Sequence, residues 1–205
     1  MTLALLTGAP GAWGLTSSST TVSSTTYSRG SFSLQAGYGY EENKLLNQDN
    51  SSSRFTGNGT FLRVDTRLWG AGPGEFRLSG SAKLMETKDS VDHANTINSD
   101  TYAGGVKVFT TSWLYLGGGL GAVHQRMRSA SADVVVTNQY YYAEAGLEIP
   151  LFSSIYLGLS GIAQVNPIRK TSPMASHSVS DGFGAFLMLI YSPPNLSITN
   201  LIPNR

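Results

Sequence analysis

The chain alternates apolar and polar residues with a period of two, and the pattern recurs about eight times. Within residues 62–69, for example, Leu62 and Val64 alternate with the fully charged Arg63 and Asp65. A period of two places successive side chains on opposite faces of a β-strand. A single such strand suits a sheet with one wet face, whereas the repeated pattern predicts a closed barrel that is apolar outside and polar inside.

Eight segments carry this alternation and are the predicted strands. They are residues 31–40, 58–69, 75–85, 101–110, 113–124, 140–149, 155–165 and 180–191. The last is apolar on both faces, but its bulkier set, which includes Phe183, Leu187 and Leu189, is expected to point outward. Each segment is close to the roughly 9 to 11 residues with which a tilted strand crosses hydrocarbon, and no apolar run approaches the about 18 to 20 residues of a spanning helix.

The connections between the predicted strands alternate between long and short. The long ones are residues 41–57, 86–100, 125–139 and 166–179, and the short ones are 70–74, 111–112 and 150–153. In an up-and-down antiparallel barrel, successive connections emerge at opposite rims. The sequence therefore predicts an all-β, eight-stranded antiparallel up-and-down barrel with long loops at one rim and tight turns at the other.

Aromatic residues occur near the predicted strand ends. Trp69 and Trp113 fall beside short connections, and Tyr38, Tyr40, Tyr102 and Tyr141 fall beside long ones; Tyr191 ends the last strand. Amphipathic aromatic rings prefer a membrane–water boundary, so these seven residues are predicted to form two interfacial belts. The alternative is that Trp and Tyr simply favour strand ends.

Composition narrows the function classes. The 205 residues are enough for one domain, of which only 13% is charged, and the net charge of +1 comes with no basic cluster, so no nucleic-acid partner is expected. The absence of Cys excludes disulfides, thiolate metal sites and a cysteine-anchored lipoprotein. No His or carboxylate spacing typical of a metal site occurs, and no cofactor is predicted.

The two ends of the chain differ from the barrel segment. Residues 1–14 resemble the end of an apolar signal peptide with a small-residue cleavage region, although a basic n-region is missing. Residues 15–29 form a Ser/Thr-rich linker, residues 30–191 the predicted transmembrane barrel, and residues 192–205 a short tail in which Pro193 and Pro194 stop the last strand.

The last strand carries the pattern Ser180-x-Gly182-x-x-Ala185-x-Leu187 and ends at Tyr191. With the eight-strand pattern over roughly residues 30–191, it resembles the small eight-stranded outer-membrane barrels, which include the OmpX-like, OmpA transmembrane-domain and opacity-type proteins. It departs from them in continuing to residue 205. The resemblance implies a place in the bacterial cell outer membrane, with long extracellular loops and short periplasmic turns. It also implies contact with membrane lipid and lipopolysaccharide, insertion by the barrel-assembly machinery, and adhesion or protein binding through the long loops.

The predicted inward face carries charges of both signs. They are Arg63, Asp65, Arg67, Arg77, Lys83, Lys107, Glu144 and Glu148. The interior of an eight-stranded barrel is wide enough only for side chains or one small ligand, and buried charges must be paired. These charged residues therefore favour a lumen that is plugged by ion pairs. The alternative is a narrow, porin-like passive pore.

Two further alternatives remain open. A lipid-modifying enzyme needs a nucleophile beside a base. Of the three histidines, His93, His124 and His177, only His177 lies next to a serine, Ser178. Adjacent residues of an extended segment point to opposite sides, so no catalytic residue is predicted and the chain is not expected to be an enzyme. In a soluble lipocalin-type barrel the apolar face would point inward and the charged face outward. Alternation by itself does not show which face is inside.

Overall fold

The computed structural model consists of eight β-strands and describes residues 29–47, 52–92, 94–128, 133–165 and 177–193. The strands are β1 (Phe32–Asn47), β2 (Ser52–Trp69), β3 (Phe76–Asp89), β4 (Thr96–Phe109), β5 (Leu114–Arg128), β6 (Asp133–Pro150), β7 (Ile155–Val165) and β8 (His177–Tyr191). The predicted signal remnant, the linker up to residue 28 and the tail from residue 194 lie outside the described residues. No described helix is long and apolar enough to cross a membrane.

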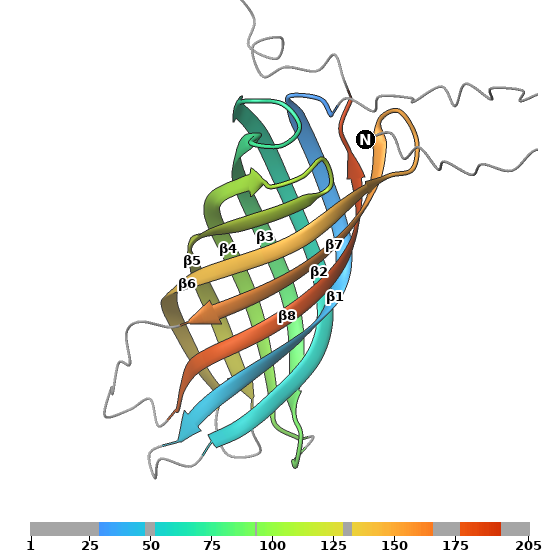
Figure 1. Cartoon of the computed structure of the whole chain (residues 1–205). Helices are drawn as coiled ribbons and strands as arrows, with labels where there is room; N and C mark the ends of the chain where they lie inside the picture. The colour runs from blue at the N-terminus through green and yellow to red at the C-terminus, as the bar shows by residue number, and fades with distance from the viewer. Residues whose placement is uncertain (1–28, 48–51, 93, 129–132, 166–176, 194–205) are drawn as a thin grey trace, which may run out of the picture.

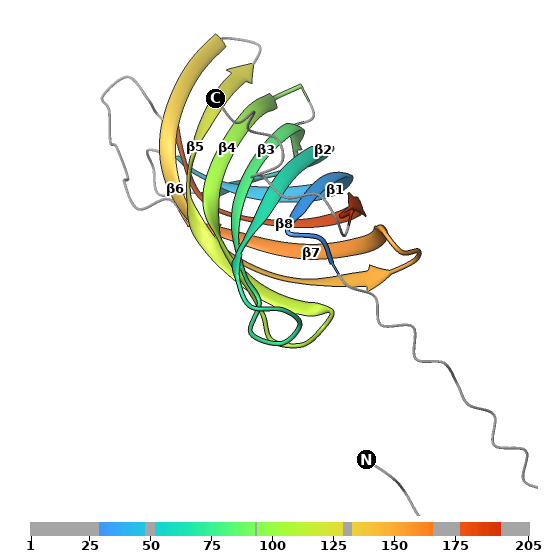
Figure 2. The ribbon, with the colours of Figure 1, turned by 90° about the horizontal axis from the view of Figure 1, so that it is seen from above.

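Each strand pairs antiparallel with the next, and β8 pairs with β1, so the sheet closes into a barrel (Figures 1 and 2). At the closure Tyr38 of β1 lies opposite Leu187 of β8 on one side and opposite Thr60 of β2 on the other. The predicted fold class, a closed eight-stranded antiparallel up-and-down barrel, is confirmed.

The two rims are built differently. We call the rim with residues 70–75, 110–113 and 151–154 the turn end, and the opposite rim, at which β1, β3, β5 and β7 end, the loop end. At the turn end, Gly70, Gly72 and Gly74 have φ angles of 78°, 64° and 85°. Residues with a side chain rarely adopt such angles, so the glycines explain why the chain reverses between β2 and β3.

The predicted strand boundaries at the loop end are wrong. Residues 41–47 and 52–57, predicted as one long connection, belong to β1 and β2, and residues 125–128 and 133–139 belong to β5 and β6. The second connection also shortens, to residues 90–95. Of the fourth predicted connection, residues 166–176 lie outside the described residues. Polar residues predominate in these stretches and suggest loops, but a strand that projects beyond an apolar zone is polar as well, and alternation does not separate the two cases.

The outward face is apolar over a continuous zone of the barrel. On β3, β5, β6 and β8 this zone covers residues 76–84, 114–122, 141–149 and 183–191, whose outward side chains are all uncharged. The next outward residues toward the loop end are Glu86, His124, Gln139 and Asp181. With a rise of about 3.3 Å per residue and a tilt of about 40°, such segments span roughly 23 Å, close to the roughly 25 Å apolar band of outer-membrane barrels.

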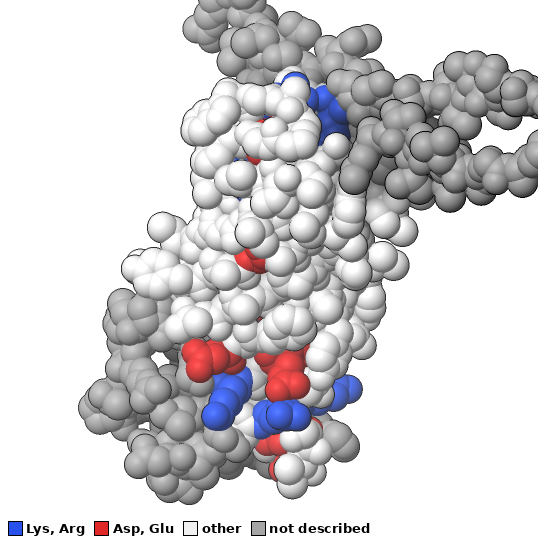
Figure 3. All heavy atoms as spheres, viewed as in Figure 1, with Lys and Arg blue, Asp and Glu red and all other residues white. Residues whose placement is uncertain are grey.

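Figure 3 shows the same division on the surface. On the face in view, the middle of the barrel is almost entirely free of charged side chains, and Lys, Arg, Asp and Glu gather at the loop end, with a smaller group at the turn end. At the loop end, Arg54 and Glu42 form an exposed ion pair with an Nε–Oε1 distance of 3.0 Å. The strands therefore continue past the apolar zone into a charged, water-facing region. We call this region, which includes Glu42 and Arg54, the charged collar.

Candidate functional site

The lumen holds most of the residues singled out in the sequence. Seven of the predicted interior charges are buried: Arg63, Asp65, Arg77, Lys83, Lys107, Glu144 and Glu148. The eighth, Arg67, lies at the turn end with its side chain 24% exposed, 3.6 Å from Glu75. The ion pairs form three groups along the barrel.

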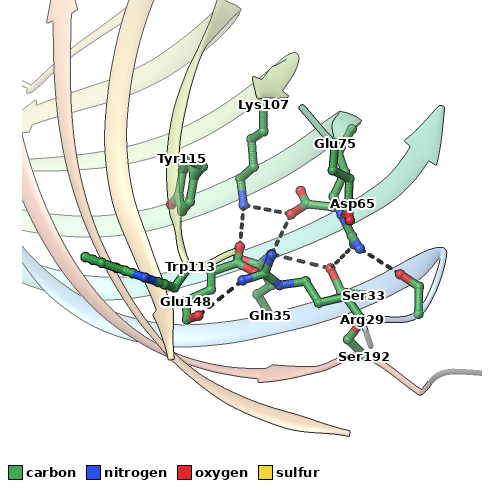
Figure 4. A network of polar contacts seen from close by, with 12 residues as sticks. Arg29, Ser33, Gln35, Asp65, Glu75, Lys107, Trp113, Tyr115, Glu148 and Ser192 are labelled. Carbon is green, nitrogen blue, oxygen red and sulfur yellow. Dashed lines mark hydrogen bonds and ion pairs between the residues drawn. The ribbon is translucent and has the colours of Figure 1, made fainter. Parts of the chain in front are cut away.

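The first group lies near the turn end and centres on Lys107 (Figure 4). The Lys107 ammonium lies 2.7 Å from Asp65 and 3.2 Å from Glu148. Asp65 also accepts hydrogen bonds from Gln35 at 2.5 Å and Ser79 at 2.7 Å. A buried carboxylate with this many donors has its lost hydration replaced, so the group tolerates burial.

Arg29 completes this group, and the sequence analysis missed it. Its Nε lies 3.1 Å from Glu148, and its guanidinium lies over the ring of Phe109, 4.1 Å from the centroid. Burial lowers the pKa of Arg29, and the Glu148 carboxylate opposes this shift. Arg29 ends a Ser/Thr tract without alternation, and only its position just before the first strand could have indicated an interior role.

The chain around Arg29 also closes the mouth of the barrel at the turn end. Arg67 donates to the carbonyl oxygen of Arg29, and Arg77 donates to that of Gly30 at 2.7 Å. A Cβ on Gly30 would lie 1.9 Å from the carbonyl oxygen of Pro193, so glycine is required for the two ends of the barrel segment to cross here. Arg77 also pairs with Glu75, which the sequence analysis did not count among the interior charges.

The second group occupies the middle of the lumen. Arg63 donates to both oxygens of Glu144 at 2.6 Å, a bidentate pair from β2 across to β6. Tyr115 and Ser160 donate to the same carboxylate at 2.5 and 2.7 Å. Four strands therefore converge on Glu144, and its hydrogen-bonding capacity is used within the barrel.

The third group lies toward the loop end, where Lys83 is 2.6 Å from Glu41 and donates to Gln164 at 3.2 Å. Gln164 in turn donates to Asn43 at 3.0 Å. Glu41 was predicted to lie in a long connection because the first predicted strand ends at residue 40. With β1 extended to Asn47, Glu41 takes the next inward position and provides the partner of Lys83.

Between and beside these groups lies a buried apolar cluster that the sequence analysis did not identify. Its members are Phe61, Met85, Val123, Tyr140, Tyr142, Tyr156, Ile162, Phe186, Met188 and Ile190. Inward glycines make room for it. A Cβ on Gly39 would lie 2.4 Å from the Phe186 ring, and one on Gly121 would lie 2.7 Å from the Tyr140 ring. Large side chains on one strand thus fill the space that glycines leave on the next.

The seven predicted interfacial aromatics all have exposed, outward side chains. Tyr40, Tyr102 and Tyr141 are the first apolar outward residues after the charged collar, and Trp69, Trp113 and Tyr191 lie at the turn end. Tyr38 lies one outward position further into the apolar zone than Tyr40. Trp69 is stacked on Phe76 with ring centroids 4.3 Å apart.

The histidines offer no catalytic arrangement in the described residues. His124 points outward and its Nδ1 lies 3.0 Å from the hydroxyl of Thr137, so it is not in the lumen. His93 and the side chains of His177 and Ser178 lie outside the described residues. The described residues contain no group of His, Asp and Glu that could hold a metal ion.

Comparisons with known proteins support the fold. No protein-family model and no curated protein sequence matches the chain. Among solved structures it is similar to Neisserial surface protein A, with a TM-score of 0.57 and 11% identity over 79% of this chain and 97% of that one. It also matches Ail of Yersinia pestis (TM-score 0.47, 13% identity, 80% and 98% covered) and OprG of Pseudomonas aeruginosa (TM-score 0.40, 9% identity, 81% and 95% covered). The likeness to the first of these supports the closed barrel fold.

Proposed function

We propose that this chain is an integral protein of the bacterial cell outer membrane that does not conduct solutes and that acts at its loop end. The observation that carries the proposal is the apolar outward zone, which is about as tall as an outer-membrane bilayer is thick and is bordered by aromatic residues. A soluble barrel would instead have its largest apolar residues inside and its charges outside. Here Leu62, Leu120 and Leu187 are more than half exposed while Asp65 and Lys107 are buried.

The packed lumen supports a structural interior over a passive pore. Three groups of ion pairs and the apolar cluster fill the cross-section, and residues 29–31 cross the mouth at the turn end. Opening a path would require breaking buried ion pairs, each of which leaves an uncompensated charge. The same contacts disfavour catalysis, because the hydroxyls of Tyr115 and Ser160 are held by Glu144 beside Arg63.

The remaining candidate surface is the loop end, and we propose that the chain binds a surface partner there, as an adhesion or interaction protein. The charged collar and the projecting parts of β1 to β6 extend past the apolar zone, where lipopolysaccharide and proteins outside the cell would meet them. Insertion would depend on the barrel-assembly machinery, which would read the terminal-strand pattern from Ser180 to Tyr191.

Two measurements test the proposal. The folded protein should partition into detergent and migrate differently in electrophoresis before and after boiling, because closed barrels resist unfolding by detergent at room temperature. Reconstituted in planar bilayers, it should give no stable unitary conductance. Recovery in the aqueous phase would contradict the membrane assignment, and reproducible single channels would contradict the closed lumen.

A further inference from the structure

The outer wall of the barrel is hollowed within the apolar zone. The hollow has a volume of about 580 Å³ and is lined by outward residues of β8, β1, β2 and β3, which are consecutive around the barrel (Figure 1). We call it the outer hollow. Its lining includes the small residues Ala36, Gly80 and Ala82 and the large residues Leu62, Leu189 and Tyr191.

The register of the strands explains the shape of the outer hollow. Ala36 of β1 lies opposite Leu189 of β8 on one side and opposite Leu62 of β2 on the other. Leu62 in turn lies opposite Ala82 of β3. Large and small outward residues therefore alternate along this row across the four strands. The surface is low at the alanines, and the leucines form the walls.

Packing inside the barrel does not explain the glycine at position 80. A Cβ on Gly80, or on Gly104 opposite it on β4, would meet no atom within 4 Å. The inward Gly37 differs, because a Cβ there would lie 2.7 Å from the side chain of Met188. Glycine in a strand interior weakens the strand and often marks a place that another molecule approaches closely. Gly80 therefore gives the hollow its depth and does not make room in the lumen.

The outer hollow runs from one border of the apolar zone toward its middle. On β8 it uses Leu189 and Tyr191, the last outward residues before the turn end, whereas on β3 it uses Gly80 and Ala82, in the middle of the zone. Across four strands spaced by about 4.8 Å it is roughly 14 Å long. That length is close to half of a hydrocarbon core of about 25 to 30 Å.

We propose that the outer hollow holds one acyl chain of a phospholipid from the leaflet at the turn end, with the lipid headgroup beside Tyr191. This inference rests on the proposed function, because it requires the apolar zone to lie in a membrane. The Tyr191 side chain is half exposed at the end of β8. A phenolic hydroxyl at a membrane boundary donates to polar groups while its ring contacts apolar ones, which suits the junction between an ester group and its chain.

The size and chemistry of the outer hollow disfavour a protein segment. Eight outward residues line it, whereas a specific protein–protein interface uses roughly 20 to 30 residues a side. A helix with its side chains is about 10 to 12 Å wide, which exceeds the space that the leucine walls leave over two strand spacings of about 4.8 Å. The outward lining is uncharged, so an extended peptide would leave its backbone polar groups unpaired in hydrocarbon. An acyl chain is narrow and has no such groups.

The test labels the wall from the lipid side. The full chain is inserted into vesicles of phosphatidylethanolamine and phosphatidylglycerol, and insertion is verified by heat-dependent migration. Two photoreactive phosphatidylethanolamines are the probes, one with a diazirine next to the ester and one with a diazirine at the chain end. Mass spectrometry then identifies the labelled peptides.

The two probes should label opposite ends of the outer hollow. The probe next to the ester should label residues 189–191, and the chain-end probe should label residues 80–82. Each should exceed the mean labelling of the apolar zone by about tenfold, the gain expected from burying about two more methylene groups. Even labelling around the barrel would overturn the proposal. The reverse order of the two probes would mean that the chain comes from the leaflet at the loop end, which also contradicts it.

Two double variants with the same added side chains locate the site. Ala36→Leu with Ala82→Leu fills the outer hollow and should lower the amount of phospholipid that stays bound after extraction into detergent by about tenfold. Ala122→Leu with Ala163→Leu adds two leucines to outward positions of β5 and β7, away from the hollow, and should leave the bound lipid unchanged. Native mass spectrometry measures the bound lipid. Equal losses from the two double variants would contradict the assignment.

The same measurements identify other occupants. A dimer without bound lipid would mean that a second copy covers the outer hollow. Stronger labelling after deletion of residues 194–205 would mean that the chain's own tail covers it, and either result would overturn the proposal. A barrel that does not insert counts against the proposed function, whereas an inserted barrel that is labelled evenly counts only against this inference.

Discussion

The inner walls of β2 and β8 differ although their outer faces are alike. Outward, both strands present large aliphatic residues such as Leu62 and Leu187. Inward, β2 presents Arg63 and Asp65, whereas β8 presents Phe186, Met188 and Ile190, all buried. Within the apolar zone the outer faces of all strands share one environment, whereas the inner face meets only other side chains. Ionic and apolar walls therefore both suit the lumen, provided that charges are paired and glycines leave room for large groups.

The comparison predicts that the ionic wall is the more sensitive to a single truncation. Glu144→Ala should lower the free energy of unfolding by about 3 to 5 kcal/mol, because it leaves the Arg63 guanidinium buried without a carboxylate. Urea unfolding in lipid vesicles measures this change. Replacing the pair together, with Arg63→Met and Glu144→Leu, should recover most of the loss. A single variant as stable as the parent would show that the middle ion pair is not needed.

Removing Arg29 should have an intermediate effect, because its main partner, Glu148, keeps the Lys107 ammonium as a second one. Arg29→Ala is expected to cost about 1.5 to 3 kcal/mol, the usual range for hydrogen bonds to charged groups. Urea unfolding in lipid vesicles measures this loss. Bilayer recordings of the same variant show whether the chain across the mouth at the turn end is needed to block conduction. Stable single-channel currents from Arg29→Ala would show that the other residues of the three groups of ion pairs are not sufficient to close the lumen.

The apolar wall should respond mildly to a small change. Ile190→Val removes one methylene group from a fully buried side chain and should cost about 0.5 to 1.5 kcal/mol. Leu189→Val, the adjacent outward residue, makes the same reduction in size on the opposite face and serves as the control. A larger loss from Leu189→Val than from Ile190→Val would mean that the inner wall is not close-packed.

The smallest effect is expected outside the lumen. Arg54→Ala removes the exposed ion pair with Glu42 in the charged collar, and it should change the free energy of unfolding by less than about 1 kcal/mol at low salt. Repeating the measurement at high salt should abolish the difference, since exposed pairs are screened. A loss comparable with that of Glu144→Ala would erase the distinction between collar and lumen.

Much of the barrel could be predicted because alternation is a local property. Eight amphipathic segments with apolar and charged faces indicated eight strands, and the outward residues of those segments form the apolar zone of the structure. The strand ends could not be predicted at the loop end, since Glu41 and Asn43 are polar whether they lie in a loop or face a polar lumen. Arg29 was missed for a related reason: it has no alternating neighbours to mark it.

By itself, the sequence determined which residues share a face, because the two-residue period of a strand depends only on position in the chain. In residues 62–69 it separated Leu62 and Val64 from Arg63 and Asp65. Only the tertiary structure decided which charged residues form ion pairs, for example Arg63 with Glu144 and Lys83 with Glu41. Those pairs join strands far apart in sequence, and closure of the sheet brings them together.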